Sequence, residues 1–268
     1  MGEMMTYPPG TFCWVDLATN APESAKAFYS AIFGWTARDV PTDYEIPYTH
    51  LFSGGKLACA LYEMAPEQGA FPYWAAYVAV NDAQASAERA EQLGGRVVMP
   101  VVDVMETGRL CFVQDPTKAV IGLWEPRKHP GAEIDNTVGA RGWCELQTRD
   151  TAAAAAFYQG LFGWTARPSG QLADANYFIF ELAGQEVGGM LELDKRWGPM
   201  PPNWSTYFGV VDCDWVVAET KRLGGSLVME PMEVDGVGRF AFLGDPQGAI
   251  FAVIQSGAAP SAVISRSI

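Results

Sequence analysis

The chain repeats its own sequence at a fixed distance. Residues 28–37 read FYSAIFGWTA and residues 157–166 read FYQGLFGWTA, an offset of 129 (157 − 28). Three later landmarks return with an offset of 130: Leu93-Gly94-Gly95 with Leu223-Gly224-Gly225, Gly108-Arg109 with Gly238-Arg239, and Asp115-Pro116 with Asp245-Pro246. A repeat of this length, kept in register over this span, indicates a duplicated domain rather than a solenoid unit. Fold and site should therefore be readable from either half.

The charge of the chain excludes several classes of partner. The formal net charge is −13 and the pI is about 4.5. Nucleic-acid phosphates and anionic membrane surfaces both attract basic segments. No apolar run approaches the ~20 residues that cross a bilayer, and residues 1–5, MGEMM, lack the basic and apolar regions of a signal peptide. We expect neither nucleic acid nor a membrane as a partner.

The cysteines indicate a reducing compartment. Five are scattered along the chain without CxxC spacing: Cys13, Cys59, Cys111, Cys144 and Cys213. An odd number of widely spaced cysteines predicts buried, reduced thiols and a cytoplasmic protein. An apolar content of 49%, with 12% aromatic residues, is enough to build the cores that would bury them.

Each half is predicted to contain the same order of elements twice. The first helix opens at Pro22 and ends at Gly34, and the second begins at the capping residue Asp82 and ends at Gly94. Strands are expected around these helices at 12–17, 35–39, 46–53, 56–64, 73–80, 96–104, 109–114 and 119–125. Residues 142–255 read the same way, so the pattern predicts four βαβββ units.

These features resemble the vicinal oxygen chelate superfamily, which includes glyoxalases, extradiol dioxygenases and bleomycin-resistance-type binding proteins. The resemblance is carried by the paired units, by Phe-Tyr-x3-Phe-Gly-Trp, by Asp-Pro-x-x-Ala and by the first-strand sequences Trp-Val-Asp-Leu and Trp-Cys-Glu-Leu. It is strongest with two-domain actinobacterial members. It implies an α+β fold with two tandem glyoxalase-like domains and curled mixed sheets, at 8–128 and 138–256, with a linker at 129–137 and a flexible tail at 257–268.

The resemblance also implies where a metal would be held. Metal-using members place a His on the first strand of a unit and a Glu or His on its last strands. The matching positions in this chain carry side chains that do not ordinarily coordinate metals. They are Trp14, Trp143, Ala75, Ser205, Gly122 and Ala252. We therefore predict that the protein uses no metal and no other cofactor.

Two histidines leave one alternative open. His129 lies in the predicted linker, and His50 stands alone on a strand, where a hydrogen-bonded structural role is more common than metal binding. Glu63 and Glu192 occupy matching places in the two halves. An oxygen-rich metal site formed by Asp16, His50 and Glu63 is kept as the alternative to a metal-free cleft.

Side-chain alternation along the strands predicts the lining of the cleft. In the first strand, Val15 and Leu17 suit the core, whereas Trp14 and Asp16 face away from it. The same argument in the other strands completes an aromatic box with one acid in each half. We predict ligand contacts for Trp14, Tyr77, Trp124, Trp143, Tyr207 and His50, and catalytic roles for Asp16 and Glu145.

Structural roles compete with these predictions. Strand tryptophans often fill cores, and Asp16 or Glu145 would then cap a loop or pair with Arg109 or Arg239. Burial beside indole rings would raise the pKa of either carboxyl group, which is how a general acid or base is tuned.

Three functions are therefore weighed. The first is metal-independent binding of a hydrophobic, partly aromatic small molecule, of the resistance, sequestration or secondary-metabolism type. The second is a metal-independent lyase, isomerase, cyclase or hydroxylase-like enzyme that uses Asp16 or Glu145 as general acid or base. The third is a metal-dependent glyoxalase, hydroxylase or dioxygenase. The partner in each case is a small molecule, the protein is a monomer or homodimer, and one or both clefts function.

Overall fold

Each half of the chain forms two consecutive βαβββ units. The computed structural model describes residues 6–42, 47–65, 71–170 and 176–256. The elements of the first half are β1 (Phe12–Thr19), α1 (Pro22–Phe33), β2 (Thr36–Val40), β3 (Tyr48–Ser53), β4 (Lys56–Glu63), β5 (Tyr73–Ala79), α2 (Ala83–Gln92), β6 (Arg96–Val104), β7 (Gly108–Gln114) and β8 (Val120–Pro126). Those of the second half are β9 (Arg141–Thr148), α3 (Thr151–Phe162), β10 (Thr165–Pro168), β11 (Tyr177–Leu182), β12 (Gln185–Glu192), a short 3-10 helix (Lys195–Trp197), β13 (Asn203–Gly209), α4 (Cys213–Arg222), β14 (Ser226–Val234), β15 (Gly238–Gly244) and β16 (Ile250–Ser256).

Each half folds into its own eight-stranded mixed sheet. The order in the first is β2-β3-β4-β1-β5-β8-β7-β6, and the second repeats it as β10-β11-β12-β9-β13-β16-β15-β14. The two units of a half meet where β1 pairs antiparallel with β5, while β4 and β8 flank this pair in parallel. Neither sheet closes into a barrel, because its edge strands remain apart in this order. The predicted fold class is confirmed.

Local sequence explains where the helices begin and end. Pro22 occupies the first turn of α1, and Gly34 ends that helix in the left-handed conformation with φ of 68°. The side chain of Asp82 caps α2 by accepting from the backbone N–H of Ala85, as expected. No helix among the described residues is long and apolar enough to cross a membrane.

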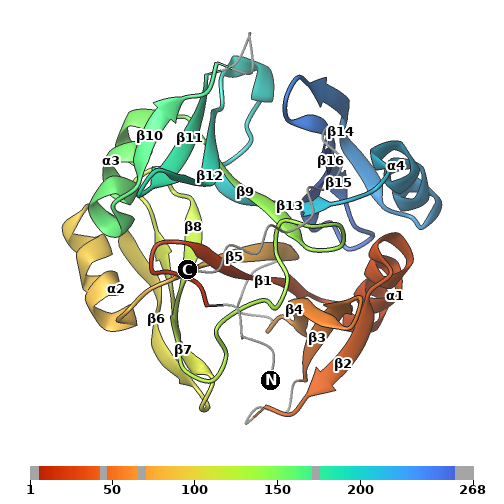
Figure 1. The fold of residues 1–268 in the computed structure, drawn as a ribbon, viewed down its shortest axis with the longest axis horizontal. Coiled ribbons are helices and arrows are strands. Elements are labelled where there is room, and N and C mark those ends of the chain that lie inside the picture. Colours follow the sequence, from red (N-terminus) through yellow and green to blue (C-terminus); the bar gives the residue numbers. More distant parts are fainter. Residues whose placement is uncertain (1–5, 43–46, 66–70, 171–175, 257–268) are drawn as a thin grey trace, which may run out of the picture.

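One hydrophobic core serves both halves. It contains the helix-facing side chains of both sheets, from Val15 and Leu17 in β1 to Phe208 in β13. The helices of one half pack against those of the other, α1 with α4 and α2 with α3, on opposite sides of the molecule (Figure 1). The sheets therefore present their other faces away from the shared core.

The repeated motifs join the two halves through matched hydrogen bonds. The hydroxyl of Tyr29 donates to Asp245 at 3.0 Å, and that of Tyr158 donates to Asp115 at 2.9 Å. In the same way, the indole N–H of Trp35 donates to a carbonyl of the second half, and that of Trp164 to one of the first half. The Phe-Tyr, Gly-Trp and Asp-Pro landmarks of the sequence repeat are thus the contacts that assemble the halves.

Candidate functional site

The sheet face opposite the core carries a hydrogen-bonded group of four side chains in the first half. The indole N–H of Trp14 donates to the hydroxyl oxygen of Tyr48 at 2.8 Å. The Tyr48 hydroxyl donates to Asp16 at 2.8 Å, and the Tyr77 hydroxyl donates to both oxygens of the same carboxylate at 3.0 and 3.1 Å. Strands β1, β3 and β5 thereby bring two tyrosines to one buried acid.

The second half places the counterpart side chains on β9, β11 and β13. The indole N–H of Trp143 donates to Tyr177 at 3.0 Å. Tyr177 and Tyr207 lie close enough to the carboxyl group of Glu145 to lower its pKa in part, but neither hydroxyl makes the direct hydrogen bond seen at Asp16. Each of these residues is the repeat counterpart of a member of the first-half group, so the duplication preserved the residues but not all of their hydrogen bonds.

Burial sets the protonation of the two acids. Desolvation raises the pKa of Asp16 to about 7, although the hydrogen bonds from Tyr48 and Tyr77 lower it in part. Burial also raises the pKa of Glu145, although the neighbouring side chains of Gln147, Tyr207 and Tyr177 lower it in part. Both acids can therefore hold or release a proton closer to neutral pH than ordinary carboxyl groups do.

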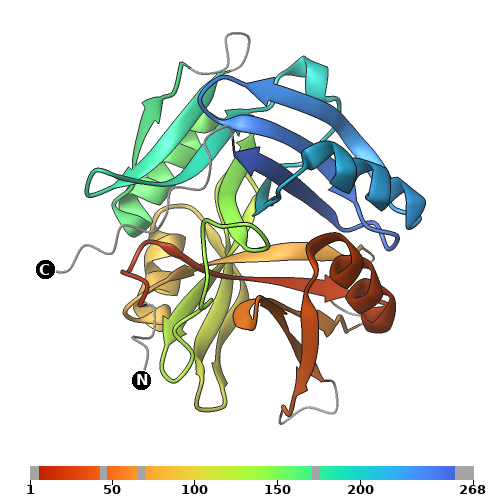
Figure 2. The ribbon, with the colours of Figure 1, turned by 45° about the vertical axis from the view of Figure 1, so that its right-hand side comes forward.

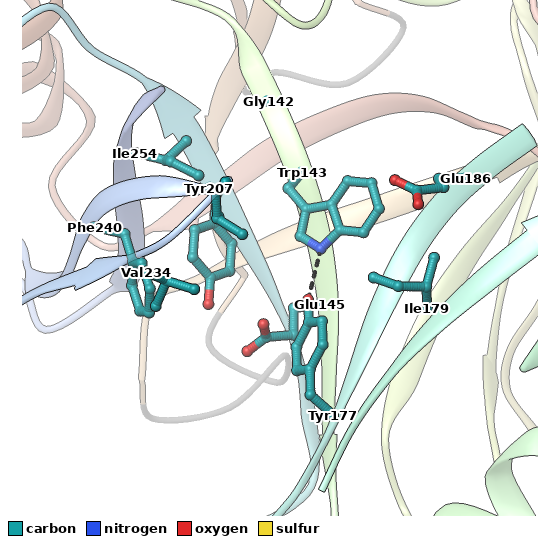
Figure 3. Close-up of a pocket in the computed structure, with 12 residues that line it drawn as sticks. Gly142, Trp143, Glu145, Tyr177, Ile179, Glu186, Tyr207, Val234, Phe240 and Ile254 are labelled. Atoms are coloured by element: carbon teal, nitrogen blue, oxygen red, sulfur yellow. Dashed lines mark hydrogen bonds between the residues drawn. The ribbon is translucent and has the colours of Figure 1, made fainter. Parts of the chain in front are cut away.

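A cavity of about 250 Å³ opens beside the group in the second half (Figure 3). Glu145, Trp143, Tyr177 and Tyr207 form part of its wall, and the exposed Glu186 lies at its rim. The remaining lining residues are Gly142, Ile179, Val234, Gly236, Val237, Phe240 and Ile254. The cavity thus combines ring faces and aliphatic side chains with one buried carboxylate.

The matching place in the first half is covered by the segment predicted as a linker. His129 lies edge-on to Trp14, with ring centroids 4.6 Å apart, and its carbonyl oxygen accepts from the Trp124 indole at 2.9 Å. The backbone N–H groups of Ala132 and Glu133 donate to β1 and β4 carbonyls at 3.0 and 2.7 Å. This segment, drawn in yellow-green, passes along the first half (Figure 2). Trp14 is therefore buried, whereas its counterpart Trp143 is half-buried.

Three substitutions between the repeats accompany this difference. Trp124 in the first half corresponds to the smaller Ile254 in the second, and His50 corresponds to Ile179. Leu57, which pairs with the covering segment, corresponds to Glu186 at the rim of the cavity. The Trp124 ring therefore takes up space in the first half that the smaller Ile254 leaves open in the second.

The predicted site residues therefore separate into two groups. Trp143, Glu145 and Tyr207 line the cavity. Trp14, Tyr77 and Trp124 belong to what we call the first-half cluster (Cys13, Trp14, Leu57, Ala60, Ala75, Tyr77, Ala79, Trp124 and Ala132). Asp16 and His50 lie beside this cluster. Neither acid pairs with the arginines considered above, because Arg109 pairs with Glu125 and Arg239 with Asp214.

Tyr48 and Tyr177 were missed by the sequence reasoning. They stand in β3 and β11, two strands away from the acids that they contact. One signal could have found them, since they are tyrosines separated by the repeat offset of 129 (177 − 48).

The residues present do not fit the metal that the superfamily resemblance implies. A side chain at Gly122 would collide with the Tyr77 ring, because an added Cβ would lie 2.3 Å from it. Ser205 donates its hydroxyl to Asn203. In the alternative set, Asp16 is bonded to two tyrosines and Glu63 is exposed, and no three His, Cys, Asp or Glu side chains in the described ranges are grouped to hold a metal.

A glycine makes room for the hydrogen-bonded group in the second half. A Cβ added to Gly189 would lie 2.0 Å from the Tyr177 hydroxyl oxygen and 2.8 Å from the Trp143 indole nitrogen. The Trp143–Tyr177 pair thus occupies the space that a side chain at position 189 would take, whereas Trp14 and Tyr48 form the same bond in the first half although the matching position carries Ala60.

Comparisons with known proteins agree on the family. The model of the Glyoxalase/Bleomycin resistance protein/Dioxygenase superfamily matches residues 11–123 and 140–253. The chain is 38% identical over 265 residues to the Mycobacterium tuberculosis protein named "Putative glyoxylase CFP32", covering 95% of this chain and 98% of the relative. It is 34% identical to the anthracycline biosynthesis protein DauV of a Streptomyces species, covering 94% and 95%.

The fold also matches a solved structure of low sequence identity. A mutant of 4-hydroxymandelate synthase from Streptomyces coelicolor superposes with a TM-score of 0.62 at 15% identity, covering 95% of each chain. Identity at this level shows likeness of fold and does not transfer an activity.

Proposed function

The chain belongs to the Glyoxalase/Bleomycin resistance protein/Dioxygenase superfamily, and on that premise we propose that its second half binds a hydrophobic, partly aromatic small molecule without a metal. The observation that carries the proposal is the cavity walled by Trp143, Tyr207 and Phe240 around the buried Glu145. Small-molecule sites are typically concave and mostly apolar, with a few placed polar groups. Flat ligands suit such walls because aromatic rings stack or meet edge to face.

The size of the cavity limits the ligand. An apolar cavity of about 150 Å³ holds benzene, so the volume of about 250 Å³ here suits one or two fused rings. A larger molecule would insert one end and leave the rest outside. The name of DauV, a protein of anthracycline biosynthesis, supports a ligand built from fused aromatic rings.

The experiment that tests the proposal is a titration with 2-naphthol, followed by quenching of tryptophan emission and by calorimetry. We expect saturation at one site per chain. Ile254→Trp places in the cavity the residue that fills the matching position of the first half, and should weaken binding roughly tenfold or more, about 1.4 kcal/mol per factor of ten.

The matched control is Trp124→Phe, a change in the first-half cluster, which should leave the affinity unchanged. Absence of saturable binding by 2-naphthol and by other two-ring compounds would contradict the proposal. Equal effects of the two variants would place the ligand elsewhere.

Proton transfer on the bound molecule is a second candidate function. It is favoured by the raised pKa of Glu145, whose carboxyl group faces the cavity. In this reaction, the carboxylate takes a proton from a carbon next to a ligand carbonyl, an enolate forms, and the proton returns from the acid or from solvent. General bases of this kind contribute about 10²–10⁴-fold to a rate.

The probe for this second candidate is 2-tetralone in D₂O, with deuterium incorporation followed by NMR. The wild-type protein should accelerate exchange, and Glu145→Gln should abolish the acceleration while retaining binding of 2-tetralone, which donates no hydrogen bond to this residue. Exchange at the buffer rate in the wild type would leave binding as the sole proposed activity.

A further inference from the structure

We infer that the second-half site selects aromatic ligands that donate a hydrogen bond, namely phenols, enols and protonated amines, over aromatic carboxylates. This inference rests on the proposed binding function and deepens it. It follows from the chain of hydrogen bonds that ends at Glu145 and from the charges that line the cavity.

A directed chain of hydrogen bonds ends at Glu145. The Ser205 hydroxyl donates to the Asn203 side-chain oxygen at 2.9 Å, and the Asn203 amide N–H donates to Gln147 at 3.2 Å. The Gln147 amide N–H then donates to Glu145 at 3.2 Å. Gln147 and Ser205 are both buried.

A backbone carbonyl fixes the direction of this chain. The Asn203 amide also donates to the carbonyl oxygen of Pro201 at 3.0 Å. A carbonyl oxygen only accepts, so the amide nitrogen of Asn203 must face Pro201 and its oxygen must face Ser205. Gln147 is thereby turned with its N–H groups toward Glu145.

The carboxylate of Glu145 has room for further donors. Its one direct hydrogen bond among the described residues comes from Gln147, whereas an ionised carboxylate offers about four lone-pair directions. Glu145 also lines the cavity. A ligand hydroxyl, enol or ammonium in the cavity would supply the donor that this carboxylate lacks.

The charges around the cavity disfavour an anion. Its lining contains two glutamates, and none of the described lining residues is Lys, Arg or His. Arg167 pairs with Glu186 at the rim and with Glu181, so this cation is already engaged. A ligand carboxylate inside would meet Glu145 without a compensating charge, which is costly in a desolvated site.

The first half lacks the chain of hydrogen bonds. The positions of Gln147, Asn203 and Ser205 correspond by the repeat offset to Ala18, Tyr73 and Ala75. Among the described residues, Asp16 accordingly receives two tyrosine hydroxyls and no amide. The polar chain is therefore a property of the open half, as expected if it serves the ligand.

A series of two-ring compounds of similar size tests the inference by calorimetry at pH 7.5. The donors are 2-naphthol and 2-naphthylmethylamine, and the compounds without a donor are 2-methoxynaphthalene and 2-naphthoate. We expect the donors to bind at least roughly tenfold more tightly than the other two. Glu145→Gln should weaken 2-naphthylmethylamine about tenfold and strengthen 2-naphthoate.

The outcomes separate this inference from the proposed function. Equal affinities for all four compounds, or a preference for 2-naphthoate, would overturn the donor selectivity and leave aromatic binding intact. Failure of all four to bind would overturn the binding function itself. The control Asp103→Asn, an exposed carboxylate of the first half, should change none of the affinities and excludes a general effect of net charge.

Discussion

At the scale of single residues, equivalent acids have diverged in their surroundings. Asp16 and Glu145 occupy the same place in the two repeats, but Asp16 accepts from Tyr48 and Tyr77, whereas Glu145 accepts from the Gln147 amide. Glu145 also lines the cavity of the second half. Asp16 is covered, so its raised pKa bears on stability rather than on a ligand.

The first prediction concerns Asp16→Asn. The folded-state pKa of Asp16, about 7, lies above its unfolded value of 3.8. Stability is therefore fully present below pH 3.8 and is lost as pH rises toward 7, because folding must then bury a charge. At about 1.36 kcal/mol for each pKa unit, the difference between 3.8 and about 7 corresponds to about 4 kcal/mol.

Urea unfolding from pH 4 to pH 8 measures this effect. The free energy of unfolding of D16N relative to wild type should rise across that range by up to about 4 kcal/mol. The exposed variant Asp103→Asn should show no such trend. A difference between D16N and wild type that is independent of pH would show that folding does not raise the pKa of Asp16.

Sequence reasoning succeeded for residues placed by strand alternation and failed for residues placed by register. The period of two put Trp14 and Asp16 on one face of β1 and Val15 on the other, as the structure does. Tyr48 reaches Asp16 across β4, and that alignment depends on a strand register with a bulge between Leu51 and Phe52. The alternation of side chains along one strand does not predict how that strand is aligned with its neighbours.

At the scale of elements, the connection between the halves is part of the first-half structure. It lies over the cluster through the ring of His129 and through backbone bonds at Ala132 and Glu133. The sequence identified these residues only as a linker, because Pro, Gly and charge predict loops but not what a loop covers.

The buried ring nitrogen Nε2 of His129 has no partner among the described residues, and burial lowers the pKa of His129 to about 4.

The second prediction is that His129→Ala exposes a second binding place. Removing the ring from Trp14 and Trp124 should leave an aromatic hollow in the first half, and the stoichiometry of 2-naphthol should rise from one toward two. The free energy of unfolding should fall by about 1–3 kcal/mol because packing is lost. Calorimetry gives both stoichiometry and affinity.

Lys128→Ala is the matched control, since Lys128 is the exposed neighbour of His129. It should keep a stoichiometry of one. If H129A also kept a stoichiometry of one, the role assigned to the His129 ring in closing the first half would be wrong.

At the scale of the whole molecule, the halves depend on each other. Their shared core runs through both sheets, and Tyr29 and Tyr158 each donate to an aspartate of the opposite half. The sequence repeat predicted two domains but not the hydrogen bonds between them, because partners 216 and 43 positions apart leave no periodic signal. The fold class itself was predictable, since the same pattern of strands and helix occurs four times along the chain.

The third prediction is that the halves unfold together. Tyr158→Phe leaves the Asp115 carboxyl without its tyrosine donor in a buried place and should lower the free energy of unfolding by about 1–3 kcal/mol. Tyr29→Phe, the same change in the other repeat, should have a similar effect. Each variant should show a single unfolding transition, at a lower denaturant concentration than wild type and at the same midpoint by tryptophan emission and by circular dichroism. Two separate transitions, of which the substitution shifts only one, would contradict the shared core.

The most direct measurement is a crystal structure of the protein soaked with 2-naphthol. The ring should lie between Trp143, Tyr207 and Phe240, with its hydroxyl within hydrogen-bonding distance, about 2.5–3.0 Å, of a Glu145 oxygen. Density for the ligand against Trp14 and Trp124 in the first half, or in the second-half cavity with the hydroxyl turned away from Glu145, would contradict the assignment of the site.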